Sequence, residues 1–399
     1  MENILFIYPD LSIGGSTTSL LALLKEIDYS QYNVDVIFLT PLSEEDKSKL
    51  PPQVNILPPR QKYNLTSTKA RVMKIINGVF TGRIFRMLYW YGVKYRKQSE
   101  IYRITMVNQI LAQINADMSV KLEKKYDVAI AFLELWATPY LIKKVKSDKK
   151  IAFMHINYTG SHFAIELDRA AYDKADRIMC VSQECVDAFL SVYPQGKDRT
   201  GYIENLIDAN AIRAKAKAPA DDVFAQYTGF KIVTVGRMQM YTKGIDRIIN
   251  CILELKSSGV DFKWYIVGDG NDMAICKEMA EKAGTGGNLV FLGAKANPYP
   301  YIVGADLFVL PSRHEGKPMV VTEAQILATP VLVTEYASAR AQVNDGVDGM
   351  VIPNEDDVLA AAVEKLCTHS RLLEKYKINL KEKDFSNAQK LEEFYRIID

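Results

Sequence analysis

The sequence predicts an α/β protein with two doubly wound, Rossmann-like domains and a cleft between them. Ten short apolar runs are spread along the 399 residues, and helix-length segments separate most of them. The runs are almost continuously apolar, as are strands of parallel sheets that helices cover on both faces. They fall into two groups of five, and the chain is too long for one typical core.

The strands are expected at 3–9, 34–40, 127–133, 150–155 and 177–182, and then at 231–236, 262–268, 289–293, 307–312 and 330–334. The switch between the groups lies around 204–230, where ENLIDANAIRAKAKAPADD interrupts the pattern with small and polar residues. We therefore predict an N-terminal domain over 1–205 and a C-terminal domain over 206–384. The last residues, 385–399, have the pattern of an amphipathic helix that packs back on the first domain.

The composition indicates a globular protein of the cytoplasm. Apolar residues make up 48% and charged residues 25% of the chain, and no apolar run reaches the length of a membrane span. The start, MENILFIYPD, has no basic segment before its apolar stretch, so no signal peptide is expected. Five scattered cysteines without a CxxC argue against a zinc site and against a disulfide framework.

Residues 60–103 form a one-sided basic insert, with eleven Lys or Arg against a single acid, Glu100. Apolar residues recur there at helical spacing, namely Ile75, Ile76, Val79, Phe80, Ile84, Leu88 and Tyr91. A basic amphipathic helix of this kind can lie on an anionic membrane surface, which would make the protein peripheral on the inner face of the membrane. The alternative is a core-facing helix with a solvated basic side. Nucleic acid is not expected, because the rest of the chain is acidic and has no known nucleic-acid motif.

Ligands of open parallel sheets bind beyond the carboxyl ends of the strands. Gly14 and Gly15 follow the first strand, where Ser16 and Thr17 can cap a helix whose N-terminus favours an anion. A plain turn is equally compatible, and the lack of GKS or GKT excludes a P-loop. His155 ends another strand, although a lone histidine is more often structural. His162 and His314 are weaker candidates.

Arg237 and Lys243 follow the strand at 231–236, and two cations at one strand end suit a diphosphate. Two solvated cations are the ordinary alternative. Gly268 and Gly270 occur in VGDGND, but Met273 stands where a dinucleotide fingerprint needs a small residue. A nicotinamide-dependent oxidoreductase is therefore disfavoured.

Residues 311–325, PSRHEGKPMVVTEAQ, follow the strand at 307–312. Pro318 suits the first position of a helix that would run over 319–328. The helix N-terminus and the amides of Gly316–Met319 would favour a phosphate, while Glu315 and Glu323 would accept hydrogen bonds from hydroxyls. A nucleotide sugar has hydroxyls on both sides of a diphosphate. A capped surface helix remains the simpler alternative.

Taken together, these residues resemble the GT-B glycosyltransferases of family 4, the retaining enzymes that use nucleotide sugars. The resemblance rests on GG at 14–15, His155, ENLID at 204–208, VGR…KG at 235–244, VGDG at 267–270, VFLG at 290–293 and ADLFVLPSRHEGKPMVVTEA at 305–324. The E-x7-E element from Glu315 to Glu323 is its most telling part.

The resemblance implies a role for each position. Arg237 and Lys243 would hold the donor diphosphate, with further donors from Gly14 and Gly15 and from the Gly316, Lys317, Pro318 and Met319 segment. Glu315 would contact the donor sugar, Glu323 the ribose, and Lys295 to Asn297 the base. His155 would lie at the reacting face. The implied catalytic residues are thus His155, Glu315, Arg237 and Lys243, with no metal and no cofactor.

One departure concerns the loop after the strand at 330–334. Many relatives have GG-x-x-E there, whereas this chain has EYASARAQ (335–342), which leaves its contacts to the donor sugar open. The segment EGKPMVV followed by a YAS-type loop resembles the corresponding segments of enzymes that build bacterial capsule or related surface polysaccharides.

We expect a retaining, metal-independent hexosyltransferase that moves a sugar from a UDP-linked donor to a hydroxyl of a glycan or lipid-linked glycan. Two alternatives stay open: a GT-B-related nucleotide-sugar epimerase, and a non-catalytic scaffold partner.

Overall fold

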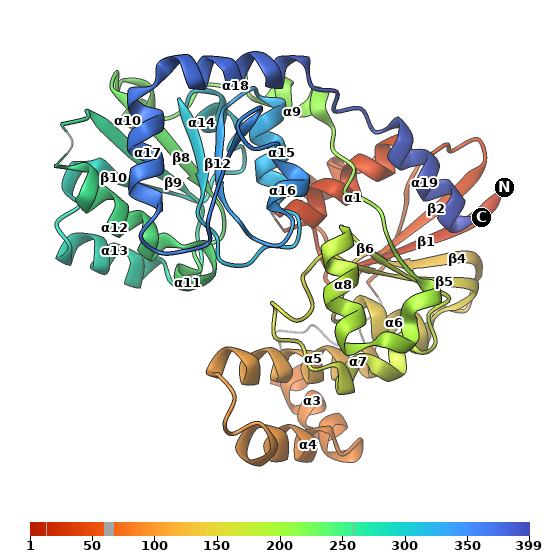
Figure 1. The fold of residues 1–399 in the computed structure, drawn as a ribbon. Helices are drawn as coiled ribbons and strands as arrows, with labels where there is room; N and C mark the ends of the chain where they lie inside the picture. The colour runs from red at the N-terminus through yellow and green to blue at the C-terminus, as the bar shows by residue number, and fades with distance from the viewer. Residues whose placement is uncertain (13, 60–67, 258) are drawn as a thin grey trace. The chain divides into compact units, whose positions relative to one another are not determined.

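A computed structural model describes residues 1–12, 14–59, 68–257 and 259–399. The chain forms two compact units, one of Met1–Ile207 with Asn387–Asp399 and one of Asp208–Ser386. Each unit contains one parallel sheet with helices on both sides (Figure 1). The domain limits expected from the sequence, after 205 and after 384, lie two residues before these divisions.

The first unit contains a seven-stranded sheet in the order β3-β2-β1-β4-β5-β6-β7, and every neighbouring pair is parallel. Its strands are β1 (Glu2–Tyr8), β2 (Tyr32–Phe38), β3 (Asn55–Leu57), β4 (Lys125–Ala131), β5 (Lys146–Met154), β6 (Arg177–Cys180) and β7 (Thr200–Tyr202). Its helices are α1 (Gly15–Glu26), α2 (Glu44–Ser48), α3 (Thr68–Phe80), α4 (Arg83–Tyr89), the π-helical turn η1 (Trp90–Lys94), α5 (Glu100–Met118), α6 (Ala137–Lys144), α7 (Ile165–Tyr172), α8 (Gln183–Val192), η2 (Pro194–Arg199) and α19 (Ala388–Ile398).

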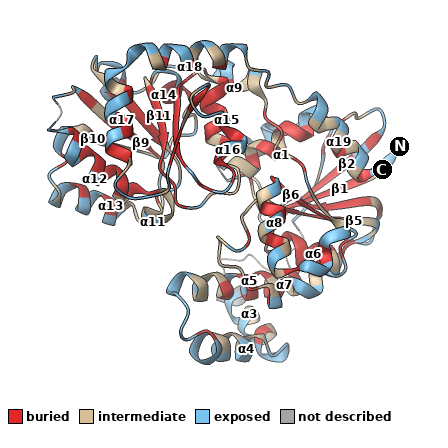
Figure 2. Cartoon of the chain, viewed as in Figure 1, coloured by how far each residue is buried: buried red, intermediate tan, exposed pale blue. Residues whose placement is uncertain are grey.

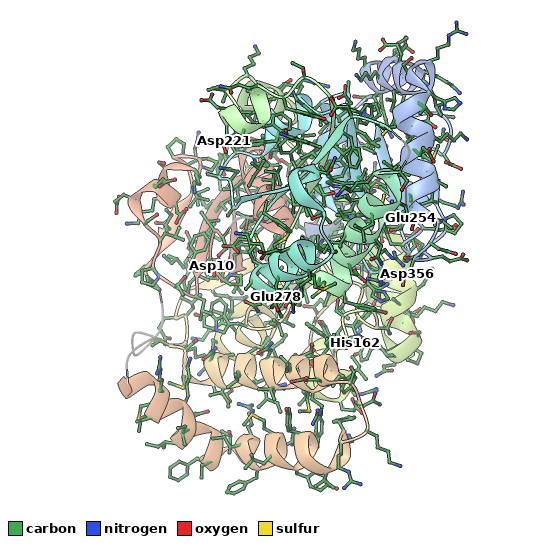
Figure 3. The ribbon with its side chains drawn as sticks, turned by 90° about the vertical axis from the view of Figure 1, so that its left-hand side faces the viewer. Asp10, His162, Asp221, Glu254, Glu278 and Asp356 are labelled. Carbon is green, nitrogen blue, oxygen red and sulfur yellow. The ribbon has the colours of Figure 1, made fainter. Side chains whose placement is uncertain are left out.

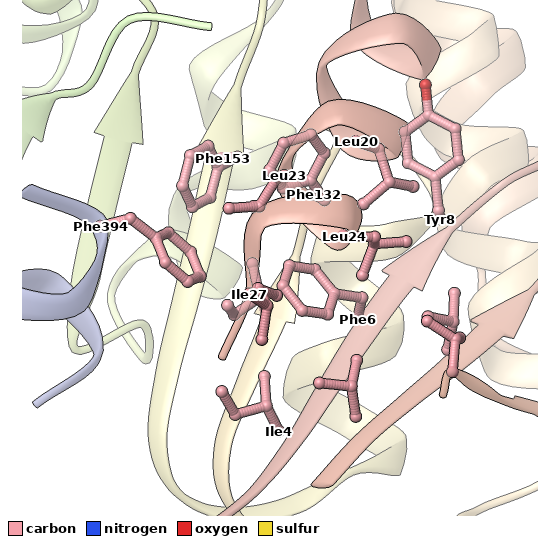
Figure 4. Close-up of a cluster of buried hydrophobic side chains, with 14 of the residues drawn as sticks. Ile4, Phe6, Tyr8, Leu20, Leu23, Leu24, Ile27, Phe132, Phe153 and Phe394 are labelled. Atoms are coloured by element: carbon pink, nitrogen blue, oxygen red, sulfur yellow. The ribbon is translucent and has the colours of Figure 1, made fainter. Parts of the chain in front are cut away.

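The side chains of alternate residues in the central strands point to opposite faces of this sheet. On β1, Phe6 packs into the core beneath α1, and Ile7 into the core beneath α5 and α6. The C-terminal helix α19 adds Phe394 and Ile398 to the α1 side, where the Phe394 ring stacks on Phe6 (Figure 4). The predicted amphipathic helix at the end of the chain therefore completes the core of the first unit.

The second unit contains a six-stranded parallel sheet in the order β10-β9-β8-β11-β12-β13. Its strands are β8 (Phe230–Val235), β9 (Phe262–Val267), β10 (Leu289–Gly293), β11 (Leu307–Leu310), β12 (Val331–Thr334) and β13 (Gly349–Ile352). Its helices are α9 (Ala209–Lys215), α10 (Asp222–Ala225), α11 (Met240–Lys243), α12 (Ile245–Leu255), α13 (Met273–Lys282), η3 (Gly286–Asn288), α14 (Tyr299–Val303), α15 (Met319–Ile326), α16 (Ala339–Gln342), α17 (Leu359–Thr368) and α18 (Ser370–Glu382).

All ten predicted strands are present, so the α/β prediction with two Rossmann-like sheets is confirmed. The sequence reading missed β3, β7 and β13, which are three or four residues long and lie at sheet edges. Short edge strands face a neighbour on one side only and need no long apolar run.

The basic insert is helical, but the single helix expected across residues 75–91 is wrong. α3 ends at Phe80, and α4 begins after Gly82, whose positive φ of 69° caps it in the left-handed conformation. Glycine reaches that conformation without the strain that a side chain adds, so the chain turns there. Residues 60–67 of the insert lie outside the described residues. Among the described helices, none is both long enough and apolar enough to span a bilayer.

Candidate functional site

The first part of the candidate site follows β8 in the second unit. Arg237 comes two residues after this strand with an exposed side chain, and Lys243 ends the short helix α11. Gly244 then takes a φ of 67°, and a Cβ there would lie 2.2 Å from the carbonyl oxygen of Pro311. Only glycine allows this approach, which places Lys243 beside the loop that follows β11.

Lys243 reaches Glu315 across that approach. The Lys243 Nζ lies 2.7 Å from the Glu315 Oε1, and both side chains are largely buried. The structure thus pairs a residue expected to hold the diphosphate with one expected to contact the sugar. A lysine ammonium has three donors, so this bond leaves further donors for an anionic ligand.

Two buried arginines hold the loop after β11 in place, and sequence reasoning missed both. Arg313 donates two hydrogen bonds to Asp246, of 2.8 and 2.7 Å, and a third to the Tyr241 carbonyl. Arg247 donates to the Pro311 carbonyl, and Asp356, labelled in Figure 3, accepts from both arginines. Bidentate charged pairs of this kind are strong and directional. They fix the loop that carries Glu315 to the turn that carries Lys243.

The segment that departs from the family pattern also supports this loop. The Ser338 hydroxyl donates to the Gly316 carbonyl, and the Gln342 amide donates to the Pro318 carbonyl at 2.8 Å. The EYASARAQ segment therefore holds the backbone before α15, where Ser338 and Gln342 are buried.

α15 starts at Met319, where the expected span of 319–328 begins. Pro318 is its N-cap with extended backbone angles, so its assignment to the first helical position is wrong. As a proline it has no amide hydrogen, and an amide contribution to donor binding can come only from its neighbours Gly316, Lys317 and Met319. The helix ends at Ile326 rather than 328, because Ala328 takes a left-handed φ of 55°.

Glu323 lies in the second turn of α15 and is buried. Burial raises its pKa to about 7, against a smaller opposing effect of the Tyr299 hydroxyl, which lies 3.4 Å from Oε1. A buried carboxyl group costs stability when it ionises, because the Tyr299 hydroxyl and the charge of Lys215 offset the effect of burial only in part. Such groups are typical of functional sites.

Replacing Glu323 by Gln is expected to stabilise the second unit above neutral pH. The pKa of about 7 in the folded protein exceeds the ordinary value of 4.5. The unfolding free energy of the parent therefore falls as pH rises from 4.5 through 7. The neutral amide has no such pH dependence, so the variant should exceed the parent in unfolding free energy by about 3 kcal/mol at pH 8. Denaturant unfolding at pH 5 and pH 8 measures this difference.

The control is Glu254→Gln, since Glu254 is an exposed carboxyl of the same unit (Figure 3). It should change little at either pH. An equal gain of Glu323→Gln at both pH values would contradict the prediction.

The loop after β10 carries the residues expected to meet the base. Lys295 pairs with Asp221 at 2.6 Å, and the Asn297 amide donates to the Lys215 carbonyl at 2.8 Å. The Asn297 side chain also accepts from the backbone N–H of Tyr299, the residue beside Glu323. The structure therefore links the predicted base loop to the predicted ribose carboxylate through Tyr299.

The glycines of VGDG have a packing role. Gly268 has a φ of 150°, and a Cβ there would lie 1.8 Å from the Gly236 carbonyl oxygen. At Gly270 a Cβ would lie 2.5 Å from the Met238 carbonyl oxygen. Both glycines let the loop after β9 pack on the loop after β8, which carries Arg237.

In the first unit, Gly14 is the N-cap of α1 and Gly15 its first residue. The expected capping by Ser16 and Thr17 is wrong, because both lie inside the first turn. The Tyr8 hydroxyl donates to the Ser16 hydroxyl, and the Thr17 hydroxyl donates to the Ser12 carbonyl. A Cβ on Gly14 would meet nothing within 4 Å among the described residues, so none of them requires glycine there by a close approach.

His155 follows β5 and lies beside the Phe132 and Phe153 rings. Burial lowers its pKa to about 4, so the ring is neutral at pH 7. Both ring nitrogens are buried and lie in hydrogen-bond geometry with none of the described residues, although the Phe132 backbone weakly opposes the lowering of the pKa. Buried polar atoms are normally satisfied, so this ring is a reasonable point for a ligand to contact. His162, from the loop before α7, is labelled in Figure 3.

Sequence reasoning missed Glu134, whose Oε2 accepts the backbone N–H of His155 at 3.1 Å. Burial raises the pKa of this carboxyl to about 7. Glu134 comes directly after the predicted strand at 127–133, and β4 lies next to β5 in the sheet. The rule that functional residues follow strands could have identified it.

Residues 229–369 match the model of the family described as "Glycosyl transferases group 1". The match lies within the second unit and covers about a third of the chain. This segment includes all of the predicted donor residues that follow β8, β10 and β11.

Among curated relatives, the chain is 29% identical over 111 residues to the Vi polysaccharide biosynthesis protein VipC/TviE of Salmonella typhi, covering 28% of this chain and 19% of that protein. It is 27% identical over 161 residues to the lipopolysaccharide core biosynthesis glycosyltransferase LpsE of Rhizobium meliloti, covering 40% of this chain and 44% of that protein. The chain thus matches less than half of the length of these two relatives.

Among solved structures, Anabaena HepE in complex with UDP and glucose superimposes with a TM-score of 0.68 at 17% identity, covering 99% of each chain. At this identity the likeness concerns the fold. The chain therefore has the GT-B fold, as the sequence predicted.

Proposed function

We propose that the protein is a retaining glycosyltransferase that transfers a sugar from a UDP-linked donor to a hydroxyl of a glycan or lipid-linked glycan. The observation that carries the proposal is the ion pair of Lys243 and Glu315 beside the start of α15, the helix that also bears the buried Glu323. The family of the second unit and the UDP in the HepE structure support it.

We assign the residues that bind the nucleotide-sugar donor from their charge and their hydrogen-bonding groups. Arg237, Lys243 and the N-terminus of α15 supply positive charge for a diphosphate, and they stabilise the charge that forms on it when the sugar leaves. Glu315 offers its second oxygen to a sugar hydroxyl, and Glu323 offers its carboxylate to the ribose. No divalent cation is assigned a role in this scheme. The placement of His155 at the reacting sugar stays a prediction.

The polysaccharide-building relatives support a surface glycan as the acceptor class. Two alternatives from the sequence would use the same fold. An epimerase would bind the nucleotide sugar and release an altered sugar without an acceptor. A scaffold partner need not bind any nucleotide.

Calorimetry with UDP, GDP and ADP, each measured before and after EDTA is added, is the first test. We expect UDP to bind, because no metal contributes to this scheme, and we expect the tightest binding from UDP among the three. Loss of UDP binding upon EDTA addition would contradict metal independence, and binding of none of the three would favour the scaffold alternative. With a UDP-sugar and an acceptor, NMR of the product should show that the anomeric configuration of the donor is kept.

A further inference from the structure

The helical insert of the first unit presents large apolar side chains to solvent. Among the described residues, thirteen of the twenty-three exposed large apolar side chains lie between Val72 and Leu111, about a tenth of the chain. Single exposed apolar residues are ordinary, but a cluster of this kind marks an interaction surface. Exposed positions prevail along α3 and α4 (Figure 2).

On α3, the exposed apolar residues share one face of the helix. They recur three and four residues apart, at Val72, Ile75, Ile76, Val79 and Phe80, and Phe80 is 87% exposed. α4 continues the pattern with Phe85, Leu88 and Tyr89. Spacings of three and four residues place side chains on one side of a helix.

Gly78 is the residue of α3 that packs closely against the neighbouring helices. A Cβ on Gly78 would lie 2.6 Å from the side chain of Ile84 in α4 and 3.2 Å from that of Ile114 in α5. Close packing therefore uses glycine, while the large apolar residues face outward. This is the reverse of a core-facing helix, the alternative that the sequence left open.

The same segment is rich in cations. Residues 71–103 contain eight Lys or Arg and one acid, Glu100. Arg83 turns inward to Asp117 and Lys94 pairs with Glu166, while the exposed cations include Arg71, Arg86, Arg96 and Lys97. We define the insert surface as the exposed residues of α3, α4 and η1 together with Arg96 and Lys97.

We propose that the insert surface docks on an anionic lipid bilayer, with its apolar side chains in the acyl boundary and its cations on the headgroups. Helices with one apolar face and a basic remainder bind membranes in this way. A second copy of the chain fits less well, because a two-fold interface would bring two strongly positive surfaces together. This proposal is independent of the sugar-transfer proposal.

Vesicle flotation of the full chain, with no donor or acceptor present, tests the docking. We expect binding to vesicles of equal parts phosphatidylcholine and phosphatidylglycerol, and little binding to phosphatidylcholine alone. Binding should weaken at least about tenfold between about 0.1 M and about 1 M salt, as the Debye length falls from about 10 Å to about 3 Å. Equal binding to both vesicle types, or none to either, would overturn the proposal.

Two matched pairs of variants separate the apolar and the charged contributions. Phe80→Glu with Leu88→Glu should abolish flotation, whereas Ile275→Glu with Ile378→Glu adds the same charge at exposed apolar sites of the second unit and should not. Arg96→Gln with Lys97→Gln should weaken binding about tenfold or more. Arg371→Gln with Lys381→Gln on α18 removes equal charge and should have little effect.

Circular dichroism melting checks that each variant is folded, and sedimentation velocity without vesicles tests the rival occupant. A dimer of the parent chain that Phe80→Glu with Leu88→Glu dissociates would assign the insert surface to a second copy and overturn the lipid proposal. Sugar transfer to a soluble acceptor should be unchanged in the variant with Phe80→Glu and Leu88→Glu. Failure of the lipid-docking proposal can therefore be told apart from failure of the sugar-transfer proposal.

Discussion

Lys243→Ala should lower kcat/KM for sugar transfer by about a hundredfold to a thousandfold, the range for losing one group that stabilises developing charge. The reason is that the Lys243 Nζ lies 2.7 Å from the Glu315 Oε1, and both side chains are largely buried. Removing the ammonium deletes a cation from the diphosphate position and leaves a carboxylate without its partner there. The remaining charge would then repel the donor.

The matched control is Lys277→Ala, which removes an exposed lysine of the same unit. It should leave kcat/KM unchanged within about twofold. The double variant Lys243→Ala with Glu315→Gln separates the two effects, because it removes the unpaired carboxylate. It should recover UDP binding in part without recovering turnover. Turnover close to that of the parent in Lys243→Ala would refute the assignment of the donor site.

Gly268→Ala should destabilise the second unit by about 4 kcal/mol or more, at the upper end for single substitutions. The added Cβ would meet the Gly236 carbonyl oxygen at 1.8 Å, and the φ of 150° is itself strained for alanine. Neither atom can move away without displacing β8 or β9. Chemical denaturation of the second unit, followed by the fluorescence of the buried Trp264, measures the loss.

Gly287→Ala provides the control in the same unit. This glycine has nothing within 4 Å of a Cβ and no left-handed φ, so the substitution should change stability by less than about 1 kcal/mol. A loss in Gly268→Ala no greater than that of the control would show that the loops after β8 and β9 can separate at little cost.

The central strands were predictable because burial on both faces requires continuous apolar runs, as at Leu307–Leu310. Lys243, Glu315 and Glu323 could be named as candidates because they lie in the segments that follow β8 and β11, where ligands of parallel sheets bind. β3 and β13 were not, because an edge strand needs few apolar residues. The break of the insert helix depends on the φ of Gly82, and a glycine alone does not reveal whether its backbone is left-handed.

The side-chain contacts that hold the candidate site in place could not be predicted from the sequence, for a different reason. Arg313 and Asp246 lie 67 positions apart in the chain, and Gln342 meets Pro318 across 24. Spacing rules describe neighbours on one element, whereas these partners meet only when strands take their places in the sheet. The pKa of about 7 at Glu323 likewise follows from burial by α9 and α14, which pack against α15.

The first unit is discontinuous in sequence, and this has a consequence for biosynthesis. Residues of the second unit form one continuous stretch from Asp208 to Ser386, whereas the core of the first unit needs Phe394 and Ile398. Domains emerging from the ribosome fold as units once their chain is available. The second unit can therefore fold while the first still exposes the apolar patch that α19 covers, so the N-terminal sheet closes its core only after the residues of the second unit have been synthesised.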